Sequence, residues 1–321
     1  MIFKKNMAFT KLVPDEVSGI TIEDLVDGLN VNIFENKGDL MPLQQGFVSA
    51  EDPFGDNFNF SHLEAFDGLW VCFAFRRETK RADSAAVARE MGDTSGMSRD
   101  QKQNKKYALT QKYLQRAVPR VTVTPIFLNM ETCEAIVFSA SSKIIDEAQS
   151  LLTFATGKNY QEEECDSRLL TFMWWDTETN TFRDTPFKTW VDKTVVVASE
   201  DGKVSASGSI EEARIAVSKG GLVAKADFVF EGEKGSRDCT LTSNGRFSKL
   251  TFPKEYFAKS NQYDLYGTMC LILSEVQEAR KMLAFWAHTF WEANREDKGM
   301  TPKIMEVWGK GDFCSRQFDD I

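Results

Sequence analysis

An uninterrupted apolar run at residues 69–75 (LWVCFAF) is the feature that most narrows what this chain can fold into. Seven consecutive apolar residues predict a buried strand. Strand and helix patterns both occur elsewhere in the 321 residues. We therefore expect an α+β fold of several mixed sheets with flanking helices.

Period-two patterns and turn residues mark the other expected strands. Residues 7–13 and 222–230 are strand-like, and residues 121–128 and 135–140 predict a hairpin joined by 129–134. Asn244–Gly245 predicts a type I′ turn in a second hairpin. Residues 169–175 and a partner near 181–187 flank a turn-like segment at 176–180. The stretch 38–55 is rich in turn residues.

Helical patterns with recognisable ends alternate with these strands. The predicted helices cover residues 21–29, 84–118 with a break around 92–96, 142–156 before Gly157, one closed by Gly220–Gly221, and a long amphipathic helix at 268–294. Ser98 with Gln101 and Ser209 with Glu212 have the spacing of capping boxes. We divide the chain into an N-terminal α+β part (1–80), a central basic helix, hairpin and helix (81–160), a β-rich part (161–267) and a C-terminal helix with extension (268–321).

The composition is that of an ordinary globular protein, with 42% hydrophobic and 27% charged residues. The first residues contain charges and no uninterrupted apolar core, so we expect no signal peptide. No run approaches the roughly 20 apolar residues that span a bilayer. The six cysteines form no CxxC pair, which favours reduced structural thiols. We expect a cytoplasmic protein.

Sequence motifs of catalysis are missing. The chain has two histidines, and His288 in the stretch FWAHTFW is expected to be packed. No phosphate-binding loop, dinucleotide-binding glycine pattern or GxSxG elbow occurs. We therefore predict no enzyme, no cofactor and no metal.

Two carboxylate groups keep a minor alternative open. Glu162, Glu163, Glu164 and Asp166 are adjacent, and Asp52 and Asp56 flank a turn. Such acids can hold magnesium together with substrate phosphates, as in a nuclease. A solvated acidic loop is the commoner outcome and is the one we expect.

Residues 76–120 are strongly basic in an acidic chain. This window has twelve Lys/Arg against five acids, a net charge of +7, whereas the whole chain carries −9. The remaining residues therefore carry −16. Such segregation allows a local patch to attract a polyanion while the rest of the surface repels it.

Helical geometry concentrates these cations. At about 100° per residue, Lys105, Lys112 and Arg116 fall within about 40° of one another. Arg99, Lys102 and Lys106 occupy the adjacent sector, while Tyr107 and Leu114 point elsewhere and give the helix something to bury. A face with six cations suits phosphate contact. A solvated face with salt bridges to the acidic remainder is the alternative.

Several ordered segments carry a resemblance to a known family. These are the start MIFKKNMAFTKL, residues 45–48 (QGFV), 68–80 (GLWVCFAFRRETK), 113–120 (YLQRAVPR) with the following hairpin and helix, 211–225 and 243–252. Over residues 1–290 the chain resembles the bacterial recombination-associated RdgC family.

The resemblance implies a ring-shaped or horseshoe homodimer that binds double-stranded DNA without sequence preference. The family is associated with the nucleoid, limits access of the strand-exchange recombinase and has no known catalytic site. Arg99, Lys102 and Lys106 match basic positions of its central helix, and Arg116 and Arg120 match its ring-closing region. Val118 stands where the family has an aromatic residue, Pro119 is unusual there, the region after Phe230 is shorter, and residues 291–321 extend beyond the usual end.

The leading hypothesis is therefore a non-catalytic, sequence-independent duplex-DNA-binding protein that modulates recombination by limiting recombinase or nuclease access. The expected DNA contacts are Arg76, Arg77, Lys80, Arg81, Arg99, Lys102, Lys105, Lys106, Lys112, Arg116 and Arg120, and the expected dimer contacts are Arg116, Val118 and Arg120. The alternative is an acidic DNA-mimicking inhibitor of a nuclease or recombinase. Trp291, Trp308, Phe313 and Phe318 could supply its anchors.

Overall fold

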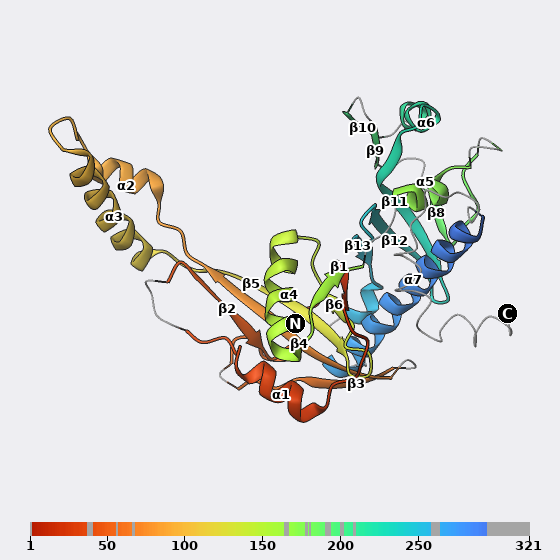
Figure 1. Cartoon of the computed structure of the whole chain (residues 1–321), viewed down its shortest axis with the longest axis horizontal. Helices are drawn as coiled ribbons and strands as arrows, with labels where there is room; N and C mark the ends of the chain where they lie inside the picture. Colours follow the sequence, from red (N-terminus) through yellow and green to blue (C-terminus); the bar gives the residue numbers. More distant parts are fainter. Residues whose placement is uncertain are drawn as a thin grey trace.

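The computed structural model describes residues 2–36, 41–55, 57–65, 68–163, 167–176, 179, 181–189, 194–199, 202–207, 210–257 and 264–293 (Figure 1). Its helices are α1 (Ile22–Asn30), α2 (Ser84–Met91), α3 (Arg99–Arg116), α4 (Ser142–Thr156), α5 (Ser167–Trp174), α6 (Glu211–Ser218) and α7 (Leu265–Ala293), with a 3-10 turn at Lys254–Phe257. Its strands are β1 (Asn6–Pro14), β2 (Leu43–Val48), β3 (Ser61–Ala65), β4 (Gly68–Thr79), β5 (Arg120–Asn129), β6 (Ala135–Val137), β7 (Tyr160–Glu162), β8 (Phe187–Thr189), β9 (Thr194–Ser199), β10 (Gly202–Ser207), β11 (Leu222–Gly232), β12 (Gly235–Thr242) and β13 (Phe247–Thr251).

One large antiparallel sheet runs through the molecule. The strand order is β10-β9-β11-β12-β13-β1-β6-β5-β4-β2, with β3 on β4, β7 on β1 and β8 on β11. The expected α+β class is confirmed. The expectation of several mixed sheets is wrong, because the strand pairs among the described residues are antiparallel.

Strand β1 joins the two halves of the sheet. Its first residues pair with β13, and its last residues pair with β6 and β7. One short strand therefore holds the N-terminal half (β2–β7) against the C-terminal half (β8–β13).

The apolar run at 69–75 lies in β4 and faces two cores, which explains its composition. Trp70 and Cys72 belong to one buried cluster, whereas Val71, Phe73 and Phe75 belong to the other. Successive strand residues point to opposite faces, so both faces of β4 must be apolar. The predicted buried strand is confirmed.

Helices α1 and α4 cover the second cluster on one face of the sheet (Figure 1). They approach closely at Gly28, where an added Cβ would lie 1.8 Å from the Ala155 carbonyl oxygen. Helix α4 ends at Gly157 with φ +70°, the left-handed residue that was predicted there.

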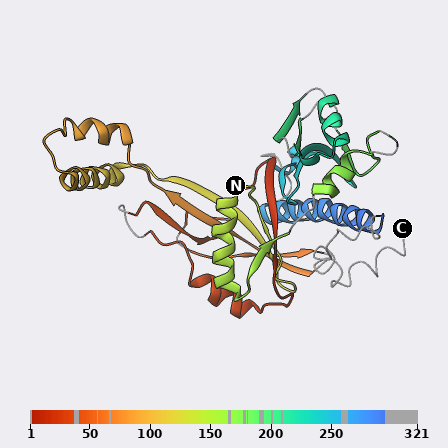
Figure 2. The same ribbon diagram turned by 45° about the horizontal axis from the view of Figure 1, so that its top comes forward.

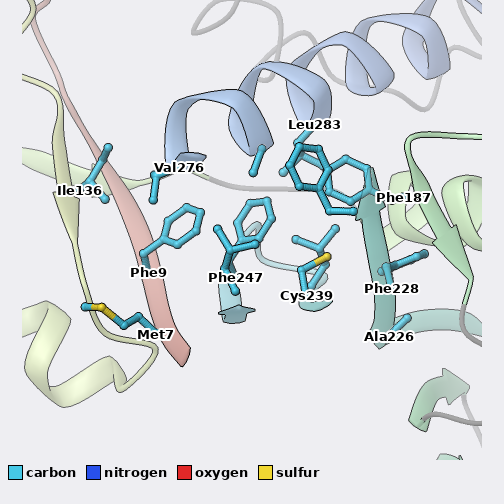
Figure 3. Close-up of a cluster of buried hydrophobic side chains, with 14 of the residues drawn as sticks. Met7, Phe9, Ile136, Phe187, Ala226, Phe228, Cys239, Phe247, Val276 and Leu283 are labelled. Carbon is cyan, nitrogen blue, oxygen red and sulfur yellow. The ribbon is translucent and has the colours of Figure 1, made fainter. Parts of the chain in front are cut away.

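Helix α7 lies along the C-terminal half and completes the first cluster (Figures 2 and 3). It buries Met269, Ile272, Val276, Leu283 and Phe290. Figure 3 shows Val276 and Leu283 above the rings of Phe9, Phe247 and Phe187. His288 is exposed on α7, so the expectation that it is packed is wrong.

Two elements differ from the sequence-based expectation. Residues 43–48 lie in the stretch that seemed to be turns, but they form β2 and pair with β4 over six positions. Position 46 requires glycine, because the Cβ of any other residue would come within 2.5 Å of the Phe34 backbone. The apolar run at 169–175 is mostly helix α5, and its expected pairing with 181–187 shrinks to a single bridge between Asp176 and Thr181.

The predicted hairpin around Asn244–Gly245 is confirmed, but its turn type is wrong. Only Gly245 has a positive φ, +75°, whereas type I′ needs two such residues. The Gly245 N–H donates to Thr242 O, and the Thr242 N–H donates to Arg246 O. A three-residue loop with glycine in the left-handed position therefore makes the turn.

Helix α6 is also present where expected, with Gly220 at φ +90° after it. It begins at Glu211 after Ile210, which makes no side-chain cap, and Ser209 lies outside the described residues.

Cys72, Cys133, Cys239 and Cys270 are free thiols, while Cys165 and Cys314 lie outside the described residues. Every helix in the described ranges is too short or too polar to cross a bilayer.

Candidate functional site

The basic window forms a helical arm that leaves the sheet between two paired strands. Strands β4 and β5 pair from Trp70–Asn129 to Thr79–Arg120. Residues 80–119, here called the arm, connect the last of these pairs, and α2 and α3 project away from the rest of the molecule, here called the body (Figures 1 and 2). The arm is thus anchored at two neighbouring points.

Local sequence sets the ends of both arm helices. Asp83 precedes α2 and its carboxylate accepts from the backbone N–H groups of Ala85 and Ala86 at 2.9 and 3.1 Å. Ser98 and Gln101 form the predicted capping box at the start of α3. Gly92 has φ +59° at the end of α2, so the chain turns between the helices at a residue without a Cβ.

The two arm helices are held together largely by polar contacts. Lys105 Nζ donates to the Met91 carbonyl oxygen at 2.9 Å, and Lys112 pairs with Glu90. The Tyr113 hydroxyl donates to the other Glu90 oxygen at 2.8 Å. Hydrogen bonds from Lys112 and Tyr113 hold the pKa of the Glu90 carboxyl below its usual range.

This packing changes the predicted cationic face of α3. Lys105 and Lys112 make their contacts with α2 and Lys102 is half-buried, so an open face of six cations is wrong. Arg99, Lys106 and Arg116 are exposed. Leu114 is buried as predicted, but Tyr107 is 67% exposed and buries little.

Part of the predicted cation set belongs to the sheet. Arg76 pairs with Glu78, donates to the Pro53 carbonyl oxygen at 3.2 Å and stacks over the Phe34 ring at 4.2 Å. Arg77 Nε lies 2.6 Å from a Glu147 oxygen.

Lys80 is only 9% exposed. By contrast, Arg81 at the base of the arm and Arg120 at the start of β5 are exposed. The six exposed cations of the predicted set are thus Arg81, Arg99, Lys106, Lys112, Arg116 and Arg120, of which Lys112 is paired with Glu90.

The expected dimer contacts lie together where the arm returns to the sheet. Arg116 ends α3, Arg120 begins β5, and Val118 between them is 88% exposed. A single exposed apolar side chain is ordinary on a protein surface, so the expected dimer contact stays a prediction.

Two residues of the predicted acidic loop form ion pairs with distant parts of the chain. Glu162 ends β7 and forms two hydrogen bonds with the Arg246 guanidinium, at 2.7 and 2.6 Å. Glu163 contacts Arg280 of α7 through both oxygens at 3.0 Å and Lys11 of β1 at 3.2 Å. These pairs tie the end of β7 to the turn before β13, to α7 and to β1, so the expected solvated loop is wrong for these two residues.

Burial alone would raise the pKa of the Glu163 carboxyl, but the charges of Arg280 and Lys11 outweigh it and hold that pKa below the usual value. No group of potential metal ligands occurs among the described residues. Glu164, Asp166 and Asp56 lie outside the described residues, as do Trp308, Phe313 and Phe318 and the side chain of Trp291.

One feature of α3 was missed from the sequence. Asn104, Tyr107, Gln111 and Gln115 are spaced by three or four residues, which places them along one stripe of the helix. The spacing is visible in the sequence, but attention to the cations alone hides it.

No protein-family model matches the chain and no curated protein matches it significantly, so the resemblance to the RdgC family stays a prediction.

Proposed function

We propose that this chain is a non-catalytic homodimer that binds double-stranded DNA through its arm and limits access of a recombinase or nuclease to that DNA. Phosphate contacts supply the affinity, so any duplex sequence is bound. A nucleoid location in the cytoplasm follows from this activity.

The observation that carries the proposal is the segregation of exposed charge onto a projecting element. The arm has nine Lys/Arg against four acids, a net charge of +5, within a chain of net charge −9. Arg99, Lys106 and Arg116 are exposed along α3, and Arg81 and Arg120 are exposed at the base. Cations spread along a rod can contact successive phosphates, while the acidic body is repelled by the same polyanion.

Charge reversal on the arm tests this directly. The variant Arg99→Glu/Lys106→Glu/Arg116→Glu should bind a mixed-sequence duplex at least about tenfold more weakly. The slope of its affinity against salt concentration should fall by about 3, because three fewer phosphate contacts release about three fewer counterions on binding. Fluorescence anisotropy across a salt series measures both quantities.

A matched control makes the same charge change on the body. Lys4→Glu/Lys143→Glu/Lys219→Glu alters three exposed lysines outside the arm. This variant should keep most of the affinity. Equal losses in the two variants would mean that overall charge, and not the arm, governs binding, and absence of duplex binding by the wild type at low salt would overturn the proposal.

The dimer is tested separately. Val118→Asp places a charge at the most exposed large hydrophobic residue among the described residues. Sedimentation equilibrium should show a dimer for the wild type and a shift towards monomer for the variant. A monomeric wild type at tens of micromolar contradicts the dimer but leaves DNA binding by the arm intact.

A second candidate, a protein-binding inhibitor, is favoured by a different surface. Residues 12–36 contain six acids and no lysine or arginine. All six, namely Asp15, Glu16, Glu23, Asp24, Asp27 and Glu35, are exposed on and around α1. Val17 and Val31 are 64% and 83% exposed beside them.

An acidic surface carries the same sign of charge as DNA and therefore suits a basic protein partner. The exposed valines beside it offer apolar contact area to that partner. Recovery of a partner on the tagged chain after nuclease treatment supports this second candidate. Loss of every partner together with the DNA supports the first.

A further inference from the structure

Helices α1 and α4 leave large apolar side chains exposed beside the point where they cross. The two helices meet at Gly28 and Ala155, where a Cβ on Gly28 would overlap the Ala155 carbonyl group. Val31 lies one turn after Gly28 and is 83% exposed. Phe154 precedes Ala155 and is 76% exposed. Both side chains therefore stand open next to the crossing.

Val17 belongs to the same region. Lys158, two residues after α4, donates to the Glu16 carbonyl oxygen at 3.3 Å and to the Ser18 hydroxyl. These bonds hold Val17, which is 64% exposed, near the C-terminal end of α4. Large apolar side chains that are exposed together mark a contact surface for another protein. This surface is here called the apolar face, namely Val17, Val31 and Phe154.

Six exposed acids lie on the segments that carry Val17 and Val31, namely Asp15, Glu16, Glu23, Asp24, Asp27 and Glu35. Among the described residues, none of the six pairs with a lysine or arginine. Lys158 beside them contacts a backbone carbonyl and a hydroxyl. An apolar face with acids around it suits a partner that combines apolar and basic side chains.

The arm of a second copy carries the matching charge. Three of its four acids have local partners, since Asp83 and Asp93 accept from backbone N–H groups. Glu90 pairs with Lys112, and the fourth acid, Asp100, lies in the first turn of α3. Five exposed cations of the arm make no ion pair among the described residues, namely Arg81, Arg89, Arg99, Lys106 and Arg116.

The arm cannot reach the apolar face of its own chain. It is anchored at the Thr79–Arg120 pair, and Figures 1 and 2 both show it projecting away from α1. A contact between the two surfaces therefore joins two copies. Helix α3 is about 27 Å long and α1 about 13 Å, so one arm can cover α1 and the acids on either side of it. Tyr107, 67% exposed on α3, supplies apolar surface to this contact.

We propose that the arm of one copy docks on the apolar face of a second copy, with the arm cations against the surrounding acids. Reciprocal docking uses both surfaces of both copies and closes the assembly at two chains. This contact is additional to the proposed function and forms without DNA. Its regulatory consequence rests on that function: duplex DNA and the acids compete for the same cations, so DNA releases the arm.

A charge swap between two variants tests the contact. Glu16→Lys/Asp27→Lys/Glu35→Lys reverses acids beside the apolar face and spares the first turn of α1. Arg89→Glu/Arg99→Glu/Lys106→Glu reverses arm cations and leaves Arg116, Val118 and Arg120 unchanged. In sedimentation velocity at low salt, each variant alone should self-associate at least about tenfold more weakly than the wild type. Their equimolar mixture should associate within about threefold of the wild type, because both contacts then join opposite charges.

A matched control moves the acid reversal off this surface. Glu64→Lys/Glu231→Lys/Glu255→Lys changes three exposed glutamates elsewhere on the body. Alone it should associate like the wild type, and mixed with the arm variant it should not restore association. Circular dichroism should show the same helix content in every variant.

Several results would overturn the contact. A wild type that does not self-associate at low salt leaves the acids to another protein. Equal association of the wild type, both variants and their mixture assigns the dimer to other residues such as Val118. Restored association in the control mixture assigns it to overall charge.

The failure of this contact and of the proposed function are distinguishable. Charge-swap recovery in a protein that binds no duplex keeps the contact and overturns the proposed function. Duplex binding without charge-swap recovery does the reverse. When both hold, added duplex should dissociate the assembly of the wild type, and assembly that persists in saturating duplex overturns the competition.

Discussion

The arm and the body of this molecule are stabilised in different ways. The body is built on two apolar clusters, with rings in direct contact such as Phe9 and Phe247, stacked with centroids 4.5 Å apart. The arm has forty residues, of which Val87 and Leu114 are its buried hydrophobics. Its helices are joined by Glu90, Lys105 and Lys112 at or near the surface.

This contrast indicates that the body and the arm contribute unequally to the stability of the protein. Exposed polar contacts contribute little to stability, whereas buried apolar surface contributes most of it. We therefore expect the body to set the global free energy of unfolding and the arm to open locally at lower cost. Surface residues of the arm can then change without threatening the fold.

The largest effect should come from removing a ring in the body. Phe247→Ala deletes the partner of Phe9 at the junction of β1 and β13, and should lower the free energy of unfolding by about 3–5 kcal/mol. Urea unfolding followed by circular dichroism measures it. The exposed Tyr107→Ala on the arm is the control and should change stability by less than about 0.5 kcal/mol. Equal effects would erase the contrast.

A slightly smaller effect is expected from the buried ion pairs of the body. Glu163→Gln leaves Arg280 without its carboxylate and should cost about 3 kcal/mol. Lys11 keeps Glu134, so the more exposed pair lost in Glu134→Gln should cost less. The pKa of Glu163 is depressed, so its stabilisation is present above its ordinary value of 4.5 and is lost as the pH falls through the folded-state pKa.

This pH dependence gives a second readout of the same residue. Between neutral pH and pH 3, the wild type should lose more stability than Glu163→Gln does, because only the wild type has this carboxylate to protonate. Parallel pH profiles for the two proteins would show that the Glu163 pairs do not stabilise the fold.

A moderate, local effect is expected inside the arm. Leu114→Ala removes one of two buried apolar side chains there and should cost about 2 kcal/mol within the arm. Hydrogen exchange followed by mass spectrometry should show faster exchange in α2 and α3 with the body unchanged. A fall in the global unfolding midpoint comparable to that of Phe247→Ala would instead couple the arm to the body.

The smallest effect should follow loss of the Glu90 carboxylate. Glu90→Gln removes the charge from the exposed pair with Lys112 and leaves one amide oxygen to accept from Lys112 or Tyr113, so only slightly faster exchange of the α2 amides is expected. The pKa of Glu90 is lowered, so its contribution in the wild type disappears as the pH falls below its usual range. Complete melting of the arm in this variant would show that it depends on this one contact.

Sequence patterns predicted local structure best at helix ends and turns, where a particular residue type is needed at a particular position. The Ser98–Gln101 capping box, Gly157 after α4 and the position of the hairpin at Asn244–Gly245, though not its turn type, all depend on neighbouring residues. Strand β2 was not predicted, because Gly46 suggests a turn. The need for glycine at this position comes from a tertiary contact with the Phe34 backbone, which the local sequence does not show. Helix α5 was hidden because a fully buried segment is apolar all round and has no visible period.

The candidate site was predictable in location but not in orientation. The charge of residues 76–120 marked the basic segment, although nothing in the sequence predicted that it projects as an arm, and the period of 3.6 residues gave the stripes of α3. Which stripe faces α2 depends on the Lys105–Met91 and Lys112–Glu90 contacts, which join residues 14 and 22 positions apart. Pairing of Glu162 and Glu163 with distant Arg246 and Arg280 was hidden for the same reason.

The anchoring of the arm has a consequence for how such a protein can change over generations. Thr79 and Arg120 are opposite each other in an antiparallel pair, so the two ends of the arm are only about 5 Å apart. A tight two-residue turn could replace all forty residues and continue the β4–β5 hairpin in the same register. The arm is therefore a cassette that a single insertion or deletion in the coding sequence can add, exchange or remove.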